Sequence, residues 1–390
     1  MITPDPRIAA RMAEIAPFHV MDILARARQM EAQGRTIIHL EIGEPDFPTP
    51  QPIIEAGMAV LQQGNLHYTP PLGLPQLRSA IADFYAGHYG VPITPQRVVV
   101  TPGASGALLL AMGVLVNAGE TVMLADPGYP CNRHFARFIE ARTLSVPVDA
   151  GTGYQLTPDL VEHYWTSGIK VVLLASPSNP TGTAVPDADV RAIAAICAER
   201  GATLIVDEIY HGLIYEGSYQ TALAQSNDIF VVNSFSKYFQ MTGWRLGWLI
   251  APEWAIEALD RLVQNLYLAA STPAQYAALA AFTPATLAIL EARKAELKVR
   301  RDYLAAALID LGFDIAVIPQ GAFYLYAGCE RFSQDSFAFA AQLLEQTGVA
   351  ITPGVDFGTY QAQRFVRFAY TTSLPDLQEA VRRLRIYLTP

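Results

Sequence analysis

The stretch SFSKYFQMTGWRLGW, residues 234–248, places one lysine just beyond an apolar run, IFVV, that is typical of a buried strand. Ser234 and Ser236 flank Lys237, and Arg245 follows eight residues after the lysine. A lysine amine that attacks a carbonyl must be partly desolvated, and hydroxyls beside a guanidinium suit a bound phosphate. The stretch therefore indicates a Schiff-base lysine beside a phosphate pocket; a helix-start lysine without chemistry is the alternative.

Lys237 also differs in setting from the other lysines, of which the chain has four in all against twenty-three arginines. Lys294 and Lys298 lie in a charged helical pattern, EARKAELKVRR, and Lys170 precedes a strand. Solvation explains those three residues, so Lys237 remains the one lysine with a sequence setting that indicates chemistry.

Length and composition favour a soluble protein of two domains. A chain of 390 residues is too long for one simple core. Hydrophobic residues make up 51% and charged residues 16%, which fits a further interface with another subunit. The net charge of −9 argues against nucleic acid or an anionic membrane as a partner.

The cysteines and apolar runs bear on location. Cys131, Cys197 and Cys329 are far apart, so we expect neither a disulfide framework nor a metal site, and a reducing compartment. The N-terminal residues lack an apolar core of signal-peptide length. The longest apolar run, Ala107–Val116, is too short to cross a bilayer. We therefore expect a cytoplasmic enzyme.

Strands and helices alternate after Pro92, which predicts a mainly parallel sheet covered by helices on both faces. Strands and helices also mix in the C-terminal portion, which indicates a smaller α+β domain. We expect an N-terminal segment, 1–47, that joins the small domain, a large domain, 48–285, and a small C-terminal domain, 286–390. The expected helices are 14–34, 52–63, 75–89, 158–167, 187–200 and a long helical stretch, 252–310; the expected strands outside the large sheet are TIIHLEI, FDIAVI, AFYLYA, ITPGVDFG and RFVRFAY.

Three strands of the large sheet are followed by polar side chains. Asn179 lies in the turn after KVVLLA, Asp207 ends TLIV, and Lys237 follows IFVV. The intervals of 28 and 30 residues are each about one strand–helix unit. We therefore expect all three side chains at the carboxyl edge of one sheet, where open α/β folds bind ligands.

A fourth segment, TPGASGALLL, joins a strand to a helix. The backbone amides of Gly103, Ala104 and Ser105 would face an anion at the helix N-terminus. The motif is weak because it is neither GxGxxG nor a P-loop, and a plain tight turn explains it as well.

Nine stretches together resemble the class I and II aminotransferases, a family of fold-type-I enzymes that depend on pyridoxal 5'-phosphate. They occur in family order over nearly the whole chain, and the resemblance is strongest to the bacterial aspartate, aromatic and broad-specificity branch. It implies an aspartate aminotransferase-like fold with a seven-stranded sheet. The stretches are LEIGEPDFPTP, YTPPLGLPQLRSAIADFY, VTPGASGALL, DPGYP, SPSNPTG, IVDEIYHGL, SFSKYFQMTGWRLGW, PQGAFYLY and FVRFAY.

The resemblance assigns roles around the cofactor ring. It makes Lys237 the residue that binds the cofactor and then carries a proton from the substrate Cα. Asp207 is similar to the carboxylate that partners the protonated pyridine nitrogen. Tyr210 and Asn179 resemble the donors to the ring oxygen, and Tyr129 resembles the aromatic residue that stacks on the ring.

The resemblance also implies how the cofactor phosphate is bound. Arg245, Ser234 and Ser236, with the backbone of Ala104 and Ser105, resemble the phosphate-binding residues of the family.

Arg367, in FVRFAY, resembles the arginine that binds the substrate α-carboxylate, for which a planar guanidinium suits a bidentate contact. Arg364 is a competing candidate, but strand alternation places it on the opposite face from Arg367. Gly43, in IGEPDF, resembles the glycine with a backbone that approaches the same carboxylate.

Tyr68, in HYTP, resembles a tyrosine that reaches the phosphate of the neighbouring subunit, so the resemblance implies a homodimer with shared active sites. Phe18, His19 and Val20 lie where relatives line the side-chain pocket, although packing residues are the alternative. No obvious second arginine suits a dicarboxylate side chain, which weakens an aspartate-specific interpretation; the neighbouring subunit could supply a basic group.

The expected reaction is a ping-pong transfer of the amino group from an L-amino acid to a 2-oxo acid. A C–S β-lyase on the same fold is the second interpretation, because it would use the same cofactor and most of the same residues. A catalytically silent regulator with a retained fold is the third. The complete set of lysine, aspartate, tyrosine and arginine candidates argues against the regulator.

Overall fold

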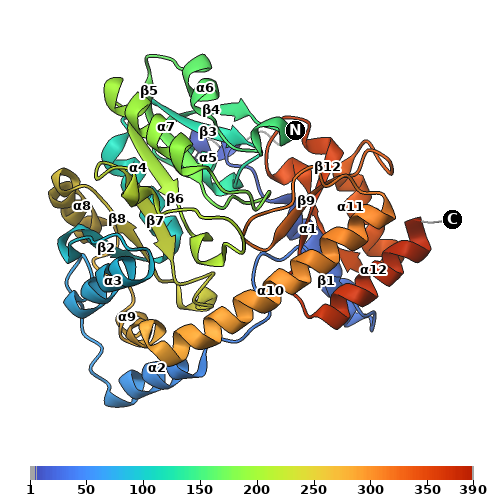
Figure 1. The fold of residues 1–390 in the computed structure, drawn as a ribbon, viewed down its shortest axis with the longest axis horizontal. Coiled ribbons are helices and arrows are strands. Elements are labelled where there is room, and N and C mark those ends of the chain that lie inside the picture. The colour runs from blue at the N-terminus through green and yellow to red at the C-terminus, as the bar shows by residue number, and fades with distance from the viewer. Residues whose placement is uncertain (1–4, 6, 389–390) are drawn as a thin grey trace.

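A seven-stranded sheet forms the centre of the larger part of the molecule in the computed structural model, which describes residues 5 and 7–388 (Figure 1). Across the sheet the strands are ordered β2–β8–β7–β6–β5–β3–β4. All neighbours pair in parallel except β8, which is antiparallel to β2 and β7. The predicted mainly parallel sheet of seven strands is therefore confirmed. The strands are β2 (Val98–Thr101), β3 (Thr121–Asp126), β4 (Arg142–Pro147), β5 (Ile169–Ala175), β6 (Thr203–Asp207), β7 (Phe230–Ser234) and β8 (Gly247–Ile250).

Helices cover both faces of this sheet because alternate residues along its strands are buried in separate hydrophobic cores. In β7, for example, Phe230 and Val232 belong to the core that includes α4 (Gly103–Leu115) and α8 (Glu253–Leu266), whereas Val231 belongs to the other. The remaining helices of this part are α2 (Gln51–Gln63), α3 (Pro75–His88), α5 (Pro130–Phe138), α6 (Pro158–His163), α7 (Asp187–Glu199) and α9 (Thr272–Leu279).

The smaller part joins the two ends of the chain. The N-terminal strand β1 (Ile38–His39) pairs with β10 (Val349–Ala350), and a three-stranded antiparallel sheet lies beside this pair. The long helix α10 (Pro284–Leu311) runs from the larger part toward the smaller one (Figure 1). The boundaries at 47/48 and 285/286 stay predictions. The other elements are β9 (Tyr324–Gly328), β11 (Thr352–Pro353), β12 (Phe365–Ala369), α1 (His19–Ala32), α11 (Ser336–Thr347) and α12 (Leu374–Leu388).

Several expected elements differ from the structure. The N-terminal helix begins at His19 instead of residue 14, because residues 10–14 form a separate 3-10 helix. FDIAVI forms only an isolated bridge from Asp314 to Gly328. TIIHLEI and ITPGVDFG contribute two strand residues each, and the stretch 252–310 is divided into α8, α9 and α10. Apolar alternation alone does not provide a neighbouring strand, which explains the short strands.

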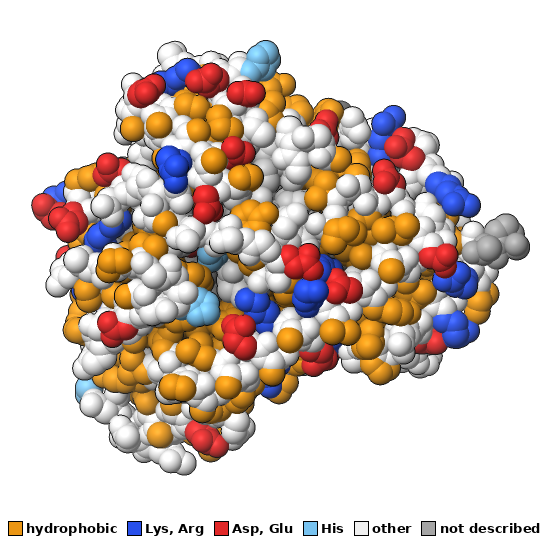
Figure 2. Space-filling view, in the orientation of Figure 1, with side chains coloured by type: hydrophobic (Ala, Val, Ile, Leu, Met, Phe, Trp, Pro, Cys, Tyr) orange, Lys and Arg blue, Asp and Glu red, His pale blue; other side chains and the backbone are white. Residues whose placement is uncertain are grey.

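Charged side chains of both signs are interspersed with apolar atoms on the face shown in Figure 2, without one extended basic surface. Within residues 5 and 7–388, no single helix is long and apolar enough to cross a membrane, although the bent pair Thr272–Phe282 and Pro284–Leu311 together meets the criteria of length and composition. The same part of the chain holds no group of three His, Cys, Asp or Glu side chains suited to a metal ion.

Candidate active site

A cavity of about 340 Å³ lies where β5, β6 and β7 end. These strands are neighbours in the sheet, so their carboxyl ends meet at one edge, as the spacing of the three polar residues predicts. Residues of both parts of the molecule line the cavity. Those among them that the sequence singles out are Phe18, Val20, Gly43, Ala104, Ser105, Tyr129, Asn179, Asp207, Tyr210, Lys237 and Arg367.

The amine of Lys237 is half-buried at the cavity and has one hydrogen-bond acceptor among the described residues. Its Nζ donates a hydrogen bond of 2.6 Å to the carbonyl of Gly43 and lies 5.9 and 5.7 Å from the ring centres of Tyr210 and Phe323. Burial lowers the pKa of Lys237 from 10.5 to about 8; Glu44 opposes this shift, whereas the positive charge of Arg367 adds to it. A substantial fraction of this amine is therefore neutral near pH 8, as a nucleophile requires.

Asp207, the last residue of β6, is a buried carboxylate beside the same cavity. Its Oδ1 accepts a hydrogen bond of 3.0 Å from the Ile209 amide. Burial raises the pKa of Asp207 to about 6, and the Ile209 N–H and the charge of Lys237 limit that rise. A cation close to this carboxylate would lower the raised pKa towards its usual value and keep the group ionised. The position therefore suits a protonated ring nitrogen.

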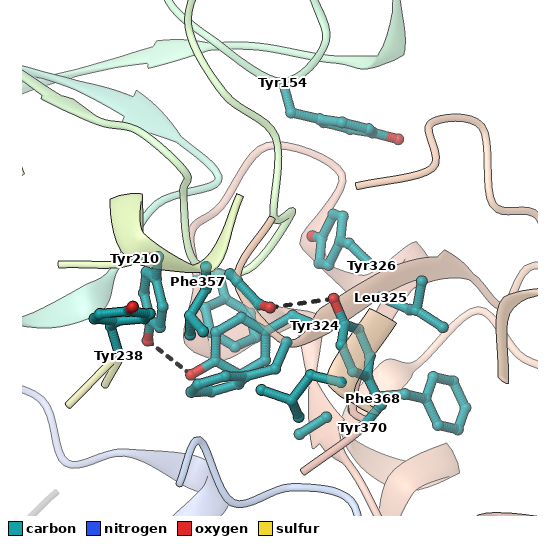
Figure 3. Packing of buried hydrophobic residues seen from close by; sticks show 14 of the residues in the cluster. Tyr154, Tyr210, Tyr238, Tyr324, Leu325, Tyr326, Phe357, Phe368 and Tyr370 are labelled. Atoms are coloured by element: carbon teal, nitrogen blue, oxygen red, sulfur yellow. Dashed lines mark hydrogen bonds between the residues drawn. The ribbon is translucent and has the colours of Figure 1, made fainter. Parts of the chain in front are cut away.

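Two tyrosines meet beside the lysine. The hydroxyl of Tyr210 lies 2.9 Å from that of Tyr324, and Figure 3 shows the two side chains in one aromatic cluster with Phe357. Burial raises the pKa of each phenol above its usual value, so both are hydrogen-bond donors near neutral pH.

Arg367 holds Asn179 and the N-terminal segment at the cavity. Its Nη1 donates to Asn179 Oδ1 at 2.9 Å, and its Nη2 donates to the Glu41 carbonyl at 2.6 Å and to Thr352 Oγ1 at 3.1 Å. The guanidinium carbon lies 4.2 Å from the ring centre of Tyr324. The buried Nε has no acceptor within residues 5 and 7–388, which leaves a donor for a ligand within the cavity.

The backbone of Gly247 closely approaches the backbone of Gly103 and Ala104 at the start of α4. A Cβ on Gly247 would lie 2.7 Å from the carbonyl carbon of Gly103 and 2.9 Å from the amide nitrogen of Ala104. A Cβ on Gly103, which has a φ of +71°, would lie 2.8 Å from an Nη atom of Arg245. The N-terminus of this thirteen-residue helix and the exposed Arg245, which does not itself line the cavity, together form a site suited to an anion.

Some predicted site residues do not line the cavity. Ser234 and Ser236 are buried outside it, where Ser234 Oγ donates to the Leu246 carbonyl at 3.0 Å and lies 2.9 Å from Ser236 Oγ. His19 packs edge-on against Phe337 instead of lining the cavity. Tyr68 is 84% exposed in the single chain.

Arg364 is a partly exposed residue outside the cavity. It pairs with Glu330 at 3.2 Å, and Arg364 precedes β12, whereas Arg367 lies within that strand and reaches the cavity. The structure therefore favours Arg367 over its competitor for any role at the cavity.

The structure also adds residues that the sequence argument did not assign: Tyr324, Thr352, Asp356 and Phe357 all line the cavity. Tyr324 explains Gly43, because a Cβ at Gly43 would lie 2.2 Å from the Tyr324 hydroxyl. The motif PQGAFYLY contains Tyr324, so a signal was present. Asp356 and Phe357 lie in a 3-10 turn and its end, for which apolar periodicity gives no signal.

Comparisons with known proteins agree with this geometry. The sequence profile of the family described as "Aminotransferase class I and II" matches residues 35–384. The chain belongs to this family. Enzymes of the family depend on pyridoxal 5'-phosphate, and the protein is an aminotransferase with the corresponding fold.

Individual relatives of this aminotransferase match it over almost the full length of both chains. The valine–pyruvate aminotransferase of Mycobacterium tuberculosis is 39% identical over 98% of each chain. The aspartate aminotransferase of Bacillus subtilis is 30% identical and covers 98% of this chain and 99% of its own. The structure of the aspartate aminotransferase of Thermotoga maritima, 32% identical, matches 98% of this chain and 100% of its own with a TM-score of 0.92. The findings support an aminotransferase and give no support to the C–S β-lyase interpretation.

The lowered pKa of Lys237 predicts its reactivity in the cofactor-free protein. Because only the neutral amine reacts, modification of Lys237 by trinitrobenzenesulfonate should rise through a midpoint near pH 8 instead of 10.5. Asp207→Asn should move this midpoint lower, because the removed negative charge favours the ammonium form. Peptide mapping by mass spectrometry at each pH measures the rate. Exposed Lys298, which pairs with Glu216 and Asp302 and has a raised pKa, is the internal control. A midpoint for Lys237 near that of Lys298 would contradict the assignment.

Proposed function

We propose that this aminotransferase transfers the amino group of an L-amino acid to a 2-oxo acid, with Lys237 as the residue that binds the cofactor and moves the proton. The observation that carries the proposal is the meeting of three groups in one cavity: the half-buried amine of Lys237, the buried carboxylate of Asp207 and the buried guanidinium of Arg367. Amino-group transfer needs an amine that binds the cofactor, an anion beside the cofactor's ring nitrogen and a cation that binds the substrate carboxylate.

The residues fit pyridoxal 5'-phosphate. The amides at the start of α4 and Arg245 would bind the phosphate, with Ser234 and Ser236 supporting them, and Asp207 would hold a proton on the ring nitrogen. The buried Asn179 and Tyr210 would donate to the ring oxygen. When bound, the cofactor supplies a sink for the electron pair released at the substrate Cα.

The chain's own groups then carry out orientation and proton transfer. Arg367, with its free Nε, would orient the substrate α-carboxylate, and Gly43 would present its backbone to the same group. The Nζ of Lys237 would take the proton from the substrate Cα and deliver it to C4′ of the cofactor. Its pKa of about 8 permits both steps near neutral pH. Tyr129 would cover the ring face.

A half-reaction screen tests this function. Purified enzyme loaded with pyridoxal 5'-phosphate should lose its visible absorbance band when mixed with a suitable amino acid, and regain it with a 2-oxo acid. Lys237→Ala should reduce the rate at least about 1,000-fold, because the nucleophile and proton carrier are removed together, whereas Lys294→Ala, which changes a lysine outside the cavity, should not. A wild-type enzyme that binds the cofactor but reacts with no amino acid would instead support the silent-regulator interpretation.

Substitution of the carboxylate receptor gives a second test. Arg367→Lys should lower kcat/KM about 10- to 100-fold, mainly through a higher KM, because a point charge replaces a guanidinium that makes several charge-assisted hydrogen bonds. Arg364→Lys is the matched control on the same segment and should leave both constants unchanged, since this arginine pairs only with exposed Glu330. Equal effects of the two substitutions, measured by steady-state kinetics, would refute the role of Arg367.

We further propose that the enzyme is a homodimer in which Tyr68 reaches the cofactor phosphate of the partner. Tyr68 is 84% exposed, and exposed Leu61, Leu66, Leu266 and Leu268 offer apolar surface for an interface. Light scattering should give twice the mass of one chain, and Tyr68→Phe should weaken retention of the cofactor during dialysis about tenfold. A monomer with full activity would contradict both statements.

We also infer a cytoplasmic location. Cys131, Cys197 and Cys329 are free thiols, as is usual in a reducing compartment. Recovery of the protein mainly outside the soluble cell fraction would contradict this inference.

A further inference from the structure

Apolar side chains make up much of the cavity wall. The start of α1 contributes Phe18, Val20, Met21 and Leu24, and each of them is at least partly exposed instead of belonging to the core. Ile42 and Leu108 add to this surface. A substrate side chain that covers these residues gains affinity by removing apolar surface from water.

The described residues that line the cavity include two basic side chains, and the proposed function uses both of them. Among the described residues that line it, Lys237 and Arg367 are the only Lys or Arg side chains. The proposed function uses the first for the cofactor and the second for the substrate α-carboxylate. Three carboxylates, those of Glu41, Asp207 and Asp356, line the same space. A second carboxylate on a substrate would thus lose water without gaining a counter-ion from the described residues that line the cavity.

Asp356 also occupies the position at which an anion could otherwise bind. Its Oδ1 and Oδ2 accept hydrogen bonds of 2.7 and 2.8 Å from the backbone amides of His19 and Val20, at the start of α1. Free amides at a helix N-terminus attract carboxylates. Here the protein's own buried carboxylate takes them up, and the same bonds fix the apolar residues of α1 at the cavity.

We propose that both half-reactions use monocarboxylic substrates with apolar side chains: an aliphatic or thioether L-amino acid as donor and a 2-oxo acid of the same class as acceptor. The inference rests on the proposed function, because in a ping-pong transfer donor and acceptor enter the same cavity in turn. Aspartate and glutamate, with their 2-oxo acids, are then excluded from both halves. Asp356 acts as a positioning residue that holds the start of α1 through the amides of His19 and Val20.

The first test compares amino acids in single-turnover half-reactions of the cofactor-loaded enzyme. L-Valine, L-leucine and L-methionine should react at least about 100-fold faster, as the second-order rate constant, than L-aspartate and L-glutamate. Relative to L-alanine, each added methylene that is buried should increase this constant about fourfold. Reaction of a dicarboxylic amino acid within tenfold of the best apolar one would overturn the substrate class and leave the aminotransferase function standing. Failure of every amino acid would overturn the function itself.

The second test measures the affinity for carboxylic acids that cannot react because they lack an amino group. Isothermal titration calorimetry of the cofactor-loaded enzyme with isovalerate and with succinate compares an apolar and a dicarboxylic acid of similar size. Isovalerate should bind at least about tenfold more tightly than succinate. Equal or tighter binding of succinate would show that a cation reaches the side-chain site, for instance from a neighbouring subunit, and would overturn the proposal.

A positive charge added to α1 gives a third test, in which the affinity for a dicarboxylic acid should increase. Met21 lines the cavity but is 55% exposed, so Met21→Lys adds a cation without burying it. This variant should bind succinate about tenfold more tightly than the parent enzyme and react faster with L-aspartate. Gln29→Lys is the matched control, because this exposed residue lies two turns along the same helix and outside the cavity. If both variants, or neither, gained affinity for succinate, α1 would not form the side-chain wall.

Discussion

The burial of one amine is the constraint on which the site depends. Lys237 follows β7 at the cavity, and its Nζ has the Gly43 carbonyl as its hydrogen-bond acceptor in the protein. An ammonium group in such a place loses hydration that one acceptor does not replace, so the neutral amine becomes accessible near pH 8. The neighbouring groups are consistent with this balance: Asp207 provides negative charge, whereas Arg367 disfavours the protonated form.

The order of strands in the sheet places the charged groups around Lys237. Asn179, Asp207 and Lys237 follow β5, β6 and β7, which pair directly in parallel. The antiparallel strand β8 then brings Gly247 against the start of α4, so backbone contacts fix the helix N-terminus that we propose as the phosphate site. The smaller part contributes Arg367 and Tyr324 from neighbouring strands β12 and β9, and their register opposes Arg367 to Tyr326 and Ala369 to Tyr324. Polar groups far apart in the chain thus converge through regular pairing.

The sequence predicts those features that arise from local pattern. Strand–helix alternation predicts the sheet, and the interval between polar residues at strand ends predicts that Asn179, Asp207 and Lys237 meet. Features made by distant segments were harder to predict. The start of α1 is fixed by Asp356, more than three hundred residues away, and FDIAVI has the composition of a strand but no continuous partner. Tyr68 is exposed in the single chain, and its proposed contact lies in the partner subunit.

The contact between Gly247 and the start of α4 has a consequence for mutational tolerance. The two backbones approach so closely that no Cβ fits between Gly247 and the amides at the start of α4. At Gly247 itself, a single methyl group would strike the carbonyl carbon of Gly103 and the nitrogen of Ala104. Gly247 thus acts through the atoms that it lacks, because any side chain at this position would push the two backbones apart.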